Sequence, residues 1–237
     1  MGMNWINWMA KFLLVFESIL KQLPFASVVR SRSYSQFWED RLIKRFVRGF
    51  QGSYVDVGAG APIWGSNTYM LYKANWMGVT VDPIKLNIAL HKIFRSRDKH
   101  YLSLVSNRIS NIIFYELDPW ELSTTNKQLA EQRVELGAKL IRERVCEVIG
   151  LRDIYAQNQL VRPSILSIDV EGSELEVLQS NDWTKFKPDL ICVEELVNPL
   201  DQSLIRSYLE IHNYSLSAYN GVSSFYTLDG SEYISFD

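Results

Sequence analysis

The sequence predicts an α/β fold in which a mostly parallel sheet carries helices on both faces. Short apolar runs of strand length alternate with stretches of helical periodicity, as in repeated β-α-β units. These apolar runs end in polar or acidic residues, which in an open α/β sheet belong to the ligand-binding edge. The chain has 237 residues, 47% of them apolar, which fits one globular domain.

The overall charge argues against one class of partner. Lys and Arg number 25 and Asp and Glu 27, so the formal net charge is −2. A protein whose main ligand is nucleic acid usually carries a basic excess. We therefore expect no nucleic acid among the partners of this chain.

The N-terminal stretch is expected to be a separate unit, an amphipathic helix and a linker over residues 1–32, ahead of a domain over 33–237. Between residues 4 and 23 apolar side chains, including Trp5 and Trp8, recur every three or four positions,. Charged residues interrupt this run, so its longest uncharged stretch is much shorter than the roughly 18 apolar residues of a membrane span. The helix would pack on the domain, pair with a second copy in a dimer, or lie on a membrane surface as a peripheral contact.

The two cysteines indicate the cellular compartment of the protein. Cys146 and Cys192 each lie inside an apolar run, and neither belongs to a Cys-x-x-Cys pair. Buried free thiols are typical of a reducing compartment. We therefore expect a cytoplasmic protein, peripheral to a membrane if the helix at 4–23 binds one.

The domain is expected to begin with a helix over 33–48, which has an apolar side and acids in its first turns. A β-α-β-α-β run follows. Its strands are predicted at 54–57, 77–81 and 101–105, and its helices at 68–75 and 85–96.

The second half repeats this rhythm after an interruption. We interpret residues 111–144 as an insertion that holds a short strand over 112–117 and a charged helix over 126–144. Strands are then predicted at 145–149, 164–170 and 190–193, and helices at 151–160, 173–180 and 203–212. Two final strands, 215–219 and 225–228, are joined near Asn220-Gly221, a dipeptide typical of β-hairpins.

The strand at 54–57 runs into a glycine turn that fits an adenosine-containing cofactor. Asp56 precedes Gly58 by two residues, and Gly60 follows. A dinucleotide fingerprint has a third glycine, where this chain has Ile63, and the carboxylate of Asp56 would repel a pyrophosphate. A carboxylate suits an amino group or a sulfonium, so the Asp-x-Gly-x-Gly pattern predicts S-adenosylmethionine.

Other polar residues at the same edge are candidates for this cofactor. Asp82 ends the second strand, where a carboxylate can accept hydrogen bonds from two ribose hydroxyls. Asn67 and Thr68 stand at a helix start, where side-chain donors or backbone N–H groups can bind a carboxylate. Ser106 and Asn107 follow the third strand.

Four segments together carry a family resemblance. They read Tyr-Ser-Gln-Phe-Trp-Glu-Asp at 34–40, Tyr-Val-Asp-Val-Gly-Ala at 54–59, Ser-Asn-Thr at 66–68 and Leu-Ser-Ile-Asp-Val-Glu-Gly-Ser-Glu at 166–174. Together they resemble the FkbM family of S-adenosylmethionine-dependent methyltransferases. The stretch Pro-Asp-Leu-Ile-Cys-Val-Glu at 188–194 is similar to the family's following strand. The resemblance covers residues 33–219.

The resemblance implies a class I methyltransferase fold, which is Rossmann-like, with a mostly parallel seven-stranded sheet and an antiparallel C-terminal hairpin. It implies an acceptor hydroxyl on a sugar, a glycan or a related small molecule. Gln36 and Glu39 resemble family positions over the cofactor site.

Methyl transfer to a hydroxyl needs a group that accepts the hydroxyl proton, because a neutral alcohol is a weak nucleophile. Asp169 and Glu171 leave the central strand two residues apart, and Glu194 ends the next strand. One of them can act as general base with a pKa raised by burial and by its neighbours. Alternatively, the three bind a divalent cation such as Mg²⁺, Mn²⁺ or Ca²⁺, which lowers the pKa of the hydroxyl.

Two other functions stay open. A nucleotide-binding oxidoreductase or a sugar-nucleotide enzyme shares the ribose-binding acid, but the missing third glycine argues against it. A non-catalytic, membrane-associated binding protein would use the helix at 4–23. The acidic residues at successive strand ends argue against a protein without catalytic activity.

Overall fold

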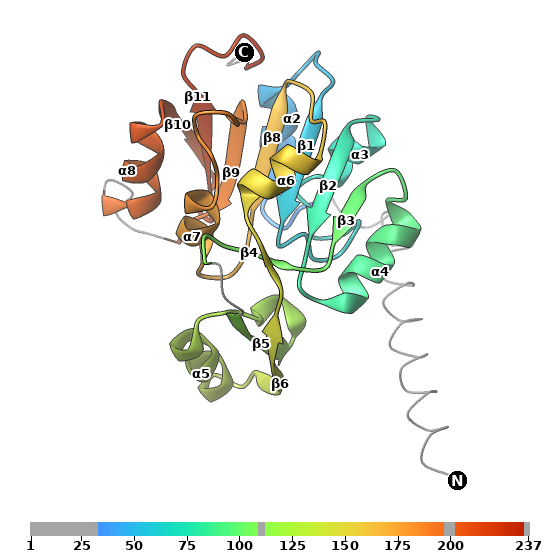
Figure 1. Ribbon diagram of the computed structural model, residues 1–237, viewed down its shortest axis with the longest axis vertical. Coiled ribbons are helices and arrows are strands. Elements are labelled where there is room, and N and C mark those ends of the chain that lie inside the picture. The colour runs from blue at the N-terminus through green and yellow to red at the C-terminus, as the bar shows by residue number, and fades with distance from the viewer. Residues whose placement is uncertain (1–32, 109–111, 197–201, 235–237) are drawn as a thin grey trace.

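The computed structural model describes residues 33–108, 112–196 and 202–234, and its centre is a seven-stranded sheet (Figure 1). The strands are β1 (Ser53–Val57), β2 (Met77–Val81), β3 (Lys99–Tyr101), β8 (Ser164–Ile168), β9 (Leu190–Glu194), β10 (Tyr214–Tyr219) and β11 (Ser223–Leu228). Their order across the sheet is β10-β11-β9-β8-β1-β2-β3. The strands from β9 to β3 in that order are parallel, and β11 is antiparallel to both β9 and β10. The predicted fold, including the C-terminal hairpin, is confirmed.

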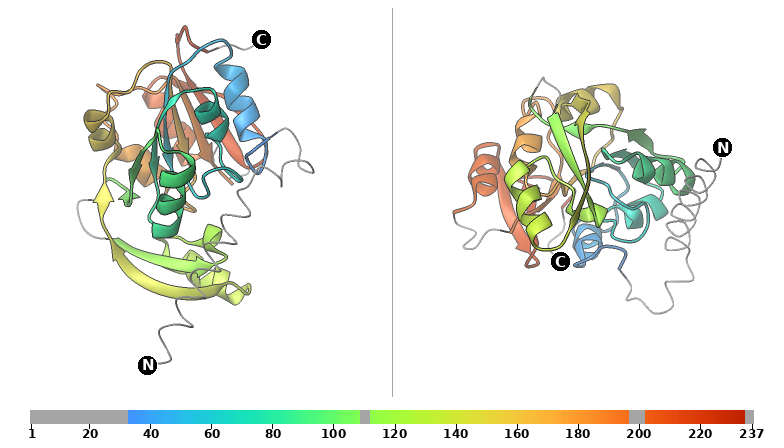
Figure 2. Two further views of the ribbon diagram at one scale, coloured as in Figure 1. Left: turned by 90° about the vertical axis from the view of Figure 1, so that its right-hand side faces the viewer. Right: turned by 90° about the horizontal axis from the view of Figure 1, so that it is seen from below.

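Helices cover both faces of the sheet, because successive strand residues point to opposite faces and both sets are apolar. Tyr54 packs with residues of α2 (Glu39–Phe46) and α3 (Tyr69–Lys73) on one face. Val55 packs on the other face with α6 (Leu151–Gln157), α7 (Glu174–Gln179) and α8 (Leu204–Ile211). Figure 2 shows α2 and α6 on opposite sides of the sheet. The helix α4 (Lys85–Phe94) joins β2 to β3.

The register of the central strands sets the position of the loops. Val57, the last residue of β1, pairs with Val81 of β2 on one side and with Ile168 of β8 on the other. All three strands are parallel and therefore end at the same edge. The glycine turn, Asp82 and Asp169 consequently leave the sheet side by side.

A smaller unit lies beyond this edge (Figure 1). It runs from β5 (Ile112–Asp118) through the 3₁₀ turn η2 (Trp120–Leu122) and α5 (Lys127–Glu135) to β6 (Lys139–Cys146), which is antiparallel to β5. We call residues 112–146 the insertion. It corresponds to the interruption that the sequence predicts at 111–144.

The predicted helix over 126–144 is wrong in its second half. The helix α5 ends at Glu135, and Gly137 adopts a positive φ of 108°, a conformation that glycine tolerates and a helix does not. Residues 139–146 then pair with β5. The cross-strand pairing outweighs the helical propensity of this charged stretch.

Two predicted strands are also divided. The run at 101–105 splits into the end of β3 and a separate strand, β4 (Leu104–Val105), and the run at 145–149 splits into the end of β6 and β7 (Val148–Ile149). β4 and β7 pair with each other in a small parallel sheet. The backbone N–H of Leu104 donates to the carbonyl of Glu147 at 2.9 Å, so the chain turns away from the main sheet at this point.

The predicted unit over 1–32, with its helix at 4–23, lies outside the described residues. Within the described ranges, no helix has both the length and the apolar character to cross a membrane. Cys146 and Cys192 are buried free thiols, as expected.

Candidate active site

A pocket of about 1260 Å³ opens where β1, β2, β8 and β9 end. Its walls come from the loops that follow these strands and from the insertion. The pocket is lined by nine of the predicted site residues: Gln36, Glu39, Gly58, Gly60, Asp82, Ser106, Asp169, Glu171 and Glu194. Four predicted cofactor residues, Asp56, Asn67, Thr68 and Asn107, are not among the lining residues.

The glycine turn after β1 is packed too closely for side chains. A Cβ at Gly58 would lie 1.7 Å from the carbonyl oxygen of Asp169, and Gly58 has a φ of 74°. A Cβ at Gly60 would lie 2.9 Å from Cη2 of Trp120. The backbone N–H of Gly58 also donates to the carbonyl of Val81 at 2.9 Å. Only glycine fits at these two positions, which place the turn against β2, β8 and the insertion.

Asp82 ties the end of β2 to this turn. Its Oδ2 accepts from the backbone N–H of Gly60 at 2.9 Å, and its Oδ1 accepts from the N–H of Ile84 at 2.6 Å and from Asn87 Nδ2 at 3.2 Å. Burial raises the pKa of Asp82 to about 7. The carboxylate lines the pocket, as a ribose-binding acid would, but a ribose would have to share its oxygens with these donors.

Asp56 points away from the pocket into a buried polar network. Its Oδ2 accepts from Thr68 Oγ1 at 2.5 Å and lies 3.8 Å from Nη1 of Arg95. Only 4% of Asp56 and none of Arg95 is exposed. Burial raises the pKa of Asp56, and Arg95 opposes that rise. Asp56 and Thr68 therefore support the glycine turn from behind instead of facing a ligand.

Arg95 organises this network, and the sequence gives no sign of it. Its Nη2 donates to Thr68 Oγ1 at 2.8 Å and to the hydroxyl of Tyr54 at 2.7 Å, while its Nε pairs with Asp98 at 2.8 Å. An arginine near the end of an amphipathic helix ordinarily faces solvent. Here the guanidinium is buried among partners from β1, from the loop before α3 and from the turn between α4 and β3.

His91, on the same helix, supports the turn directly. The side chain is fully buried, and its Nε2 lies 3.1 Å from the carbonyl oxygen of Gly60. Burial lowers the pKa of His91, so the ring is neutral and Nε2–H donates to that carbonyl. No motif in the sequence indicates this role for His91.

The remaining predicted cofactor residues are placed less centrally. Asn67 donates from Nδ2 to Ser167 Oγ at 3.3 Å, and Asn107 donates to Gln179 Oε1 at 3.0 Å on an exposed surface. Ser106 lines the pocket. The structure therefore brings Ser106 to the site but not Asn67 or Asn107.

Glu39 and Gln36 form the wall beside the C-terminal hairpin. Glu39 is 3% exposed. Its Oε2 accepts from the N–H of Phe37 at 2.9 Å, and its Oε1 accepts from Asn220 Nδ2 at 3.1 Å and Ser223 Oγ at 3.3 Å. These donors are all neutral, so this carboxylate is held at the pocket wall without a counter-ion among them.

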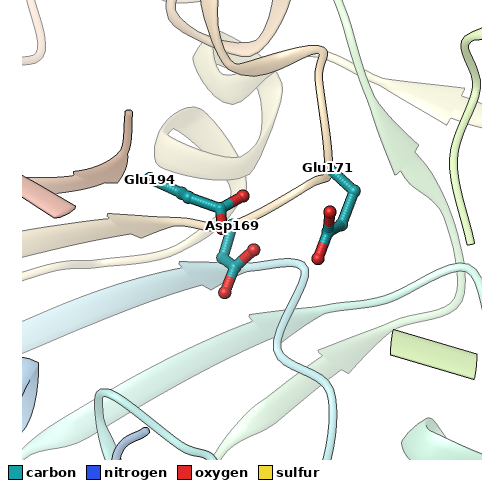
Figure 3. A group of neighbouring side chains, drawn as sticks. All are labelled: Asp169, Glu171 and Glu194. Atoms are coloured by element: carbon teal, nitrogen blue, oxygen red, sulfur yellow. The ribbon is translucent and has the colours of Figure 1, made fainter. Parts of the chain in front are cut away.

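Three carboxylates meet at the ends of β8 and β9 (Figure 3). Asp169 and Glu171 follow β8, Glu194 ends β9, and one carboxylate oxygen of each lies within 4.8 Å of the others. Glu171 adopts a positive φ of 61°, which is unusual for a residue with a side chain,. This conformation, with Gly172 after it, sends the side chain of Glu171 back toward Asp169.

Crowding and burial raise the pKa values at this cluster. Burial raises the pKa of Asp169 well above its ordinary value, and the neighbouring charges of Glu194 and Glu171 raise it further. Burial, with Glu171 and Glu174, raises the pKa of Glu194 to about 7. Asp169 and Glu194 therefore both bind a proton more tightly than ordinary carboxylates do.

The insertion holds the cluster from the other side. Arg133 of α5 forms an ion pair with Glu171 and donates from Nη1 to the carbonyl of Leu122 at 2.7 Å. Thr124 Oγ1 donates to the carbonyl of Glu171 at 2.8 Å. Arg133 also lowers the pKa of Glu194. A single helix of the insertion thus fixes one carboxylate and influences another.

Two aromatic side chains of the insertion complete the pocket. Trp120 lies over Gly60, and Phe114 packs with Ile84 and Leu104 at the end of β2 and on β4. Both line the pocket. Sequence reasoning selected neither these residues nor Arg133, because their role depends on how the insertion folds back over the sheet edge.

Comparison with family models identifies the domain to which these residues belong. A model of the methyltransferase FkbM domain matches residues 56–216, a stretch that contains the glycine turn, the insertion and the three carboxylates. A search of curated protein sequences found no match. Among solved structures, a Pyrococcus horikoshii protein provisionally described as an RNA methyltransferase is similar at 10% identity with a TM-score of 0.41, over 82% of this chain and 80% of that chain. A likeness at this level carries no argument about function.

Proposed function

Because this chain belongs to the methyltransferase FkbM family, we propose that it transfers a methyl group from S-adenosylmethionine to a hydroxyl group of a sugar, a glycan or a related metabolite. One observation carries the proposal: the glycine turn, Asp82 and the three carboxylates line the same pocket. In this proposal the methyl donor therefore binds beside a group that accepts the hydroxyl proton.

The residues present fit this donor. Gly58 and Gly60 keep side chains out of the turn, Asp82 faces the pocket beside it, and the acidic wall suits a sulfonium cation,. The volume of about 1260 Å³ exceeds the roughly 300–1,000 Å³ of ordinary ligand pockets. It therefore has room for a donor and an acceptor together. S-adenosylmethionine would supply an electrophilic methyl group.

Asp169 and Glu194 are the groups that we assign to proton removal. Arg133 pairs with Glu171, whereas Asp169 and Glu194 have no ion pair with any described residue. The pKa of Glu194, about 7, is close to neutral pH, where a general base works best. In this proposal Glu171 positions the acceptor and the Asp169–Glu194 pair takes its proton.

A metal-assisted route is the alternative for the same reaction. Three oxygens within 4.8 Å of one another match the hard ligands of Mg²⁺, Mn²⁺ or Ca²⁺. The guanidinium of Arg133, however, already pairs with the carboxylate of Glu171. We propose the metal-free route, for which extensive dialysis against EDTA leaves methyl transfer unchanged. Loss of activity with EDTA, restored by Mg²⁺ or Mn²⁺, would establish the metal route.

Titration calorimetry with S-adenosylmethionine, S-adenosylhomocysteine and NAD tests the proposal. We expect the first two to bind and NAD to show no heat of binding. Binding of NAD alone would exclude a methyltransferase site and favour a dinucleotide-dependent enzyme. Mass analysis of the products formed with deuterated methyl donor then identifies the class of acceptor.

A further inference from the structure

The walls of the pocket are strongly acidic. Eight lining residues carry a carboxyl group: Glu39, Asp82, Asp118, Glu121, Asp169, Glu171, Glu176 and Glu194. Arg108 is the one lysine, arginine or histidine among the described residues that line it. The undescribed internal stretches 109–111 and 197–201 contain no lysine, arginine or histidine in the sequence.

Within the described part of the chain, the basic side chains nearby do not balance this charge. Arg108 lies 3.9 Å from Glu176, and Arg133, outside the lining, is paired with Glu171. No described ion pair involves Glu39, Asp118 or Glu121. Glu39 is nearly fully buried and accepts hydrogen bonds from neutral donors.

Protonation of the buried acids does not remove the excess of negative charge in the pocket. Burial raises the pKa values of Asp82, Asp169 and Glu194. With all three protonated and both ion pairs counted as neutral, Glu39, Asp118 and Glu121 have no cationic partner among the described residues. A concave, partly dry surface with uncompensated carboxylates concentrates cations and repels anions.

We propose that the acceptor is a hydroxylated molecule that carries a protonated amine, and not a phosphorylated, nucleotide-linked or nucleic-acid substrate. The inference rests on the proposed function, since it concerns the second ligand of the same pocket. In the reaction an oxygen–carbon bond forms as the sulfur–carbon bond breaks, and the sulfur keeps the electron pair. The hydroxyl proton passes to the Asp169–Glu194 pair.

The amine has a place on each side of the pocket. Glu39, the first residue of α2, lies on the wall beside the C-terminal hairpin. Asp118 and Glu121 lie on the wall formed by the insertion. Glu39 is 3% exposed, so an ammonium beside it gains more than it would in water. Asp118 and Glu121 are exposed, and their attraction for an ammonium is weaker and screened by salt. For a phosphate, the described lining residues offer one cation, Arg108, which Glu176 already approaches.

Methyl transfer to three matched sets of compounds tests the inference. The full-length protein is incubated with labelled S-adenosylmethionine and with amino sugars and amino alcohols, the corresponding neutral sugars and polyols, or the corresponding sugar phosphates and nucleotide sugars. We expect at least about tenfold more label in the amine set than in the neutral set, and least in the anionic set. If S-adenosylmethionine binds in calorimetry but the amine set is not labelled most, or no set is labelled, the inference is overturned. If S-adenosylmethionine does not bind, the proposed function itself fails.

Variants in which an amide replaces a carboxylate show which wall of the pocket causes the preference for amines. The double variant Asp118→Asn, Glu121→Gln should reduce the preference for amines over neutral acceptors by about tenfold, and added salt should reduce it further. Glu135→Gln is the matched control, because Glu135 is exposed on α5 in the same insertion and does not line the pocket. An unchanged preference in the double variant, or an equal loss in the control, would overturn the role of the insertion wall.

Discussion

The sheet and the insertion both form the pocket, but they contribute different kinds of groups to it. The sheet contributes backbone turns and strand-end carboxylates on a fully buried frame, in which Val55 and Leu166 are 0% exposed. The insertion exposes large apolar side chains, with Val145 61% and Leu136 87% exposed, and reaches the pocket region through a few long side chains such as Trp120 and Arg133. The sheet therefore fixes where the chemistry occurs, while the insertion decides what is enclosed and how the carboxylates are held.

The largest effect is expected on the sheet side. Asp169→Asn removes one carboxylate of the proton-accepting pair and should lower kcat by about 10²–10⁴-fold, while binding of S-adenosylhomocysteine persists in calorimetry. Glu210→Gln is the control, since Glu210 is an exposed residue of α8 far from the pocket lining. Unaltered turnover in Asp169→Asn would show that proton removal does not depend on this residue.

A smaller effect is expected where the two regions meet. Arg133→Met should lower kcat/KM by up to about 10²-fold, because Glu171 loses the partner that positions it. The acidic limb of the pH profile should move to higher pH, because removing a positive charge raises the pKa of Glu194.

Arg142→Met is the matched control for Arg133. Arg142 also belongs to the insertion, but it pairs with Glu116 and its side chain is 55% exposed. We expect its pH profile to coincide with that of the unmodified protein. Identical profiles for the two variants would mean that Arg133 stabilises the insertion without acting on the carboxylates.

Within the insertion, Trp120→Ala should weaken binding of S-adenosylmethionine by about tenfold, or about 1.4 kcal/mol, because the ring covers the glycine turn at Gly60. Calorimetry measures this change directly. Leu136→Ala, at the most exposed apolar side chain of the unit, should alter neither affinity nor stability by more than about 0.5 kcal/mol. An unweakened Trp120→Ala would show that the insertion does not enclose the donor.

The smallest effect concerns stability and pH. The pKa of Glu194 is raised on folding from 4.5 to about 7, so the stability linked to it is complete below pH 4.5 and is lost as the pH rises through 7. The free energy of unfolding should therefore decrease between pH 5 and 8 by about 1 kcal/mol, after allowance for partial exposure of this group. Glu194→Gln should flatten this decrease in urea unfolding curves. Parallel pH dependence in both proteins would place the pKa of Glu194 near its ordinary value.

The sheet could be predicted because its signals are local. An apolar strand, a glycine turn and an acid at the strand end occupy consecutive residues, so Gly58, Gly60, Asp82 and Asp169 were identified with their places in the pocket. Asp56 shows the limit of that reasoning. The motif predicts a ligand contact, whereas the buried Arg95 turns the carboxylate inward.

The insertion was less predictable for a related reason. The stretch 126–144 has helical composition, yet Gly137 and pairing with β5 convert its second half into a strand. Pairing partners that lie far apart in sequence leave no periodic signal in either segment alone. The contacts of Trp120 with Gly60 and of Arg133 with Glu171 follow from that fold and could not be predicted from the sequence.

The sequence alone determined the α/β class, the family resemblance, the methyl-donor hypothesis and the carboxylates at the strand ends, because each depends on residues adjacent in the chain. The tertiary structure decided which of those residues share a pocket, which carboxylate pairs with Arg133, and how acidic the enclosed space is. Burial, orientation and net field depend on neighbours brought together by folding, and these set the chemistry that the same side chains can perform.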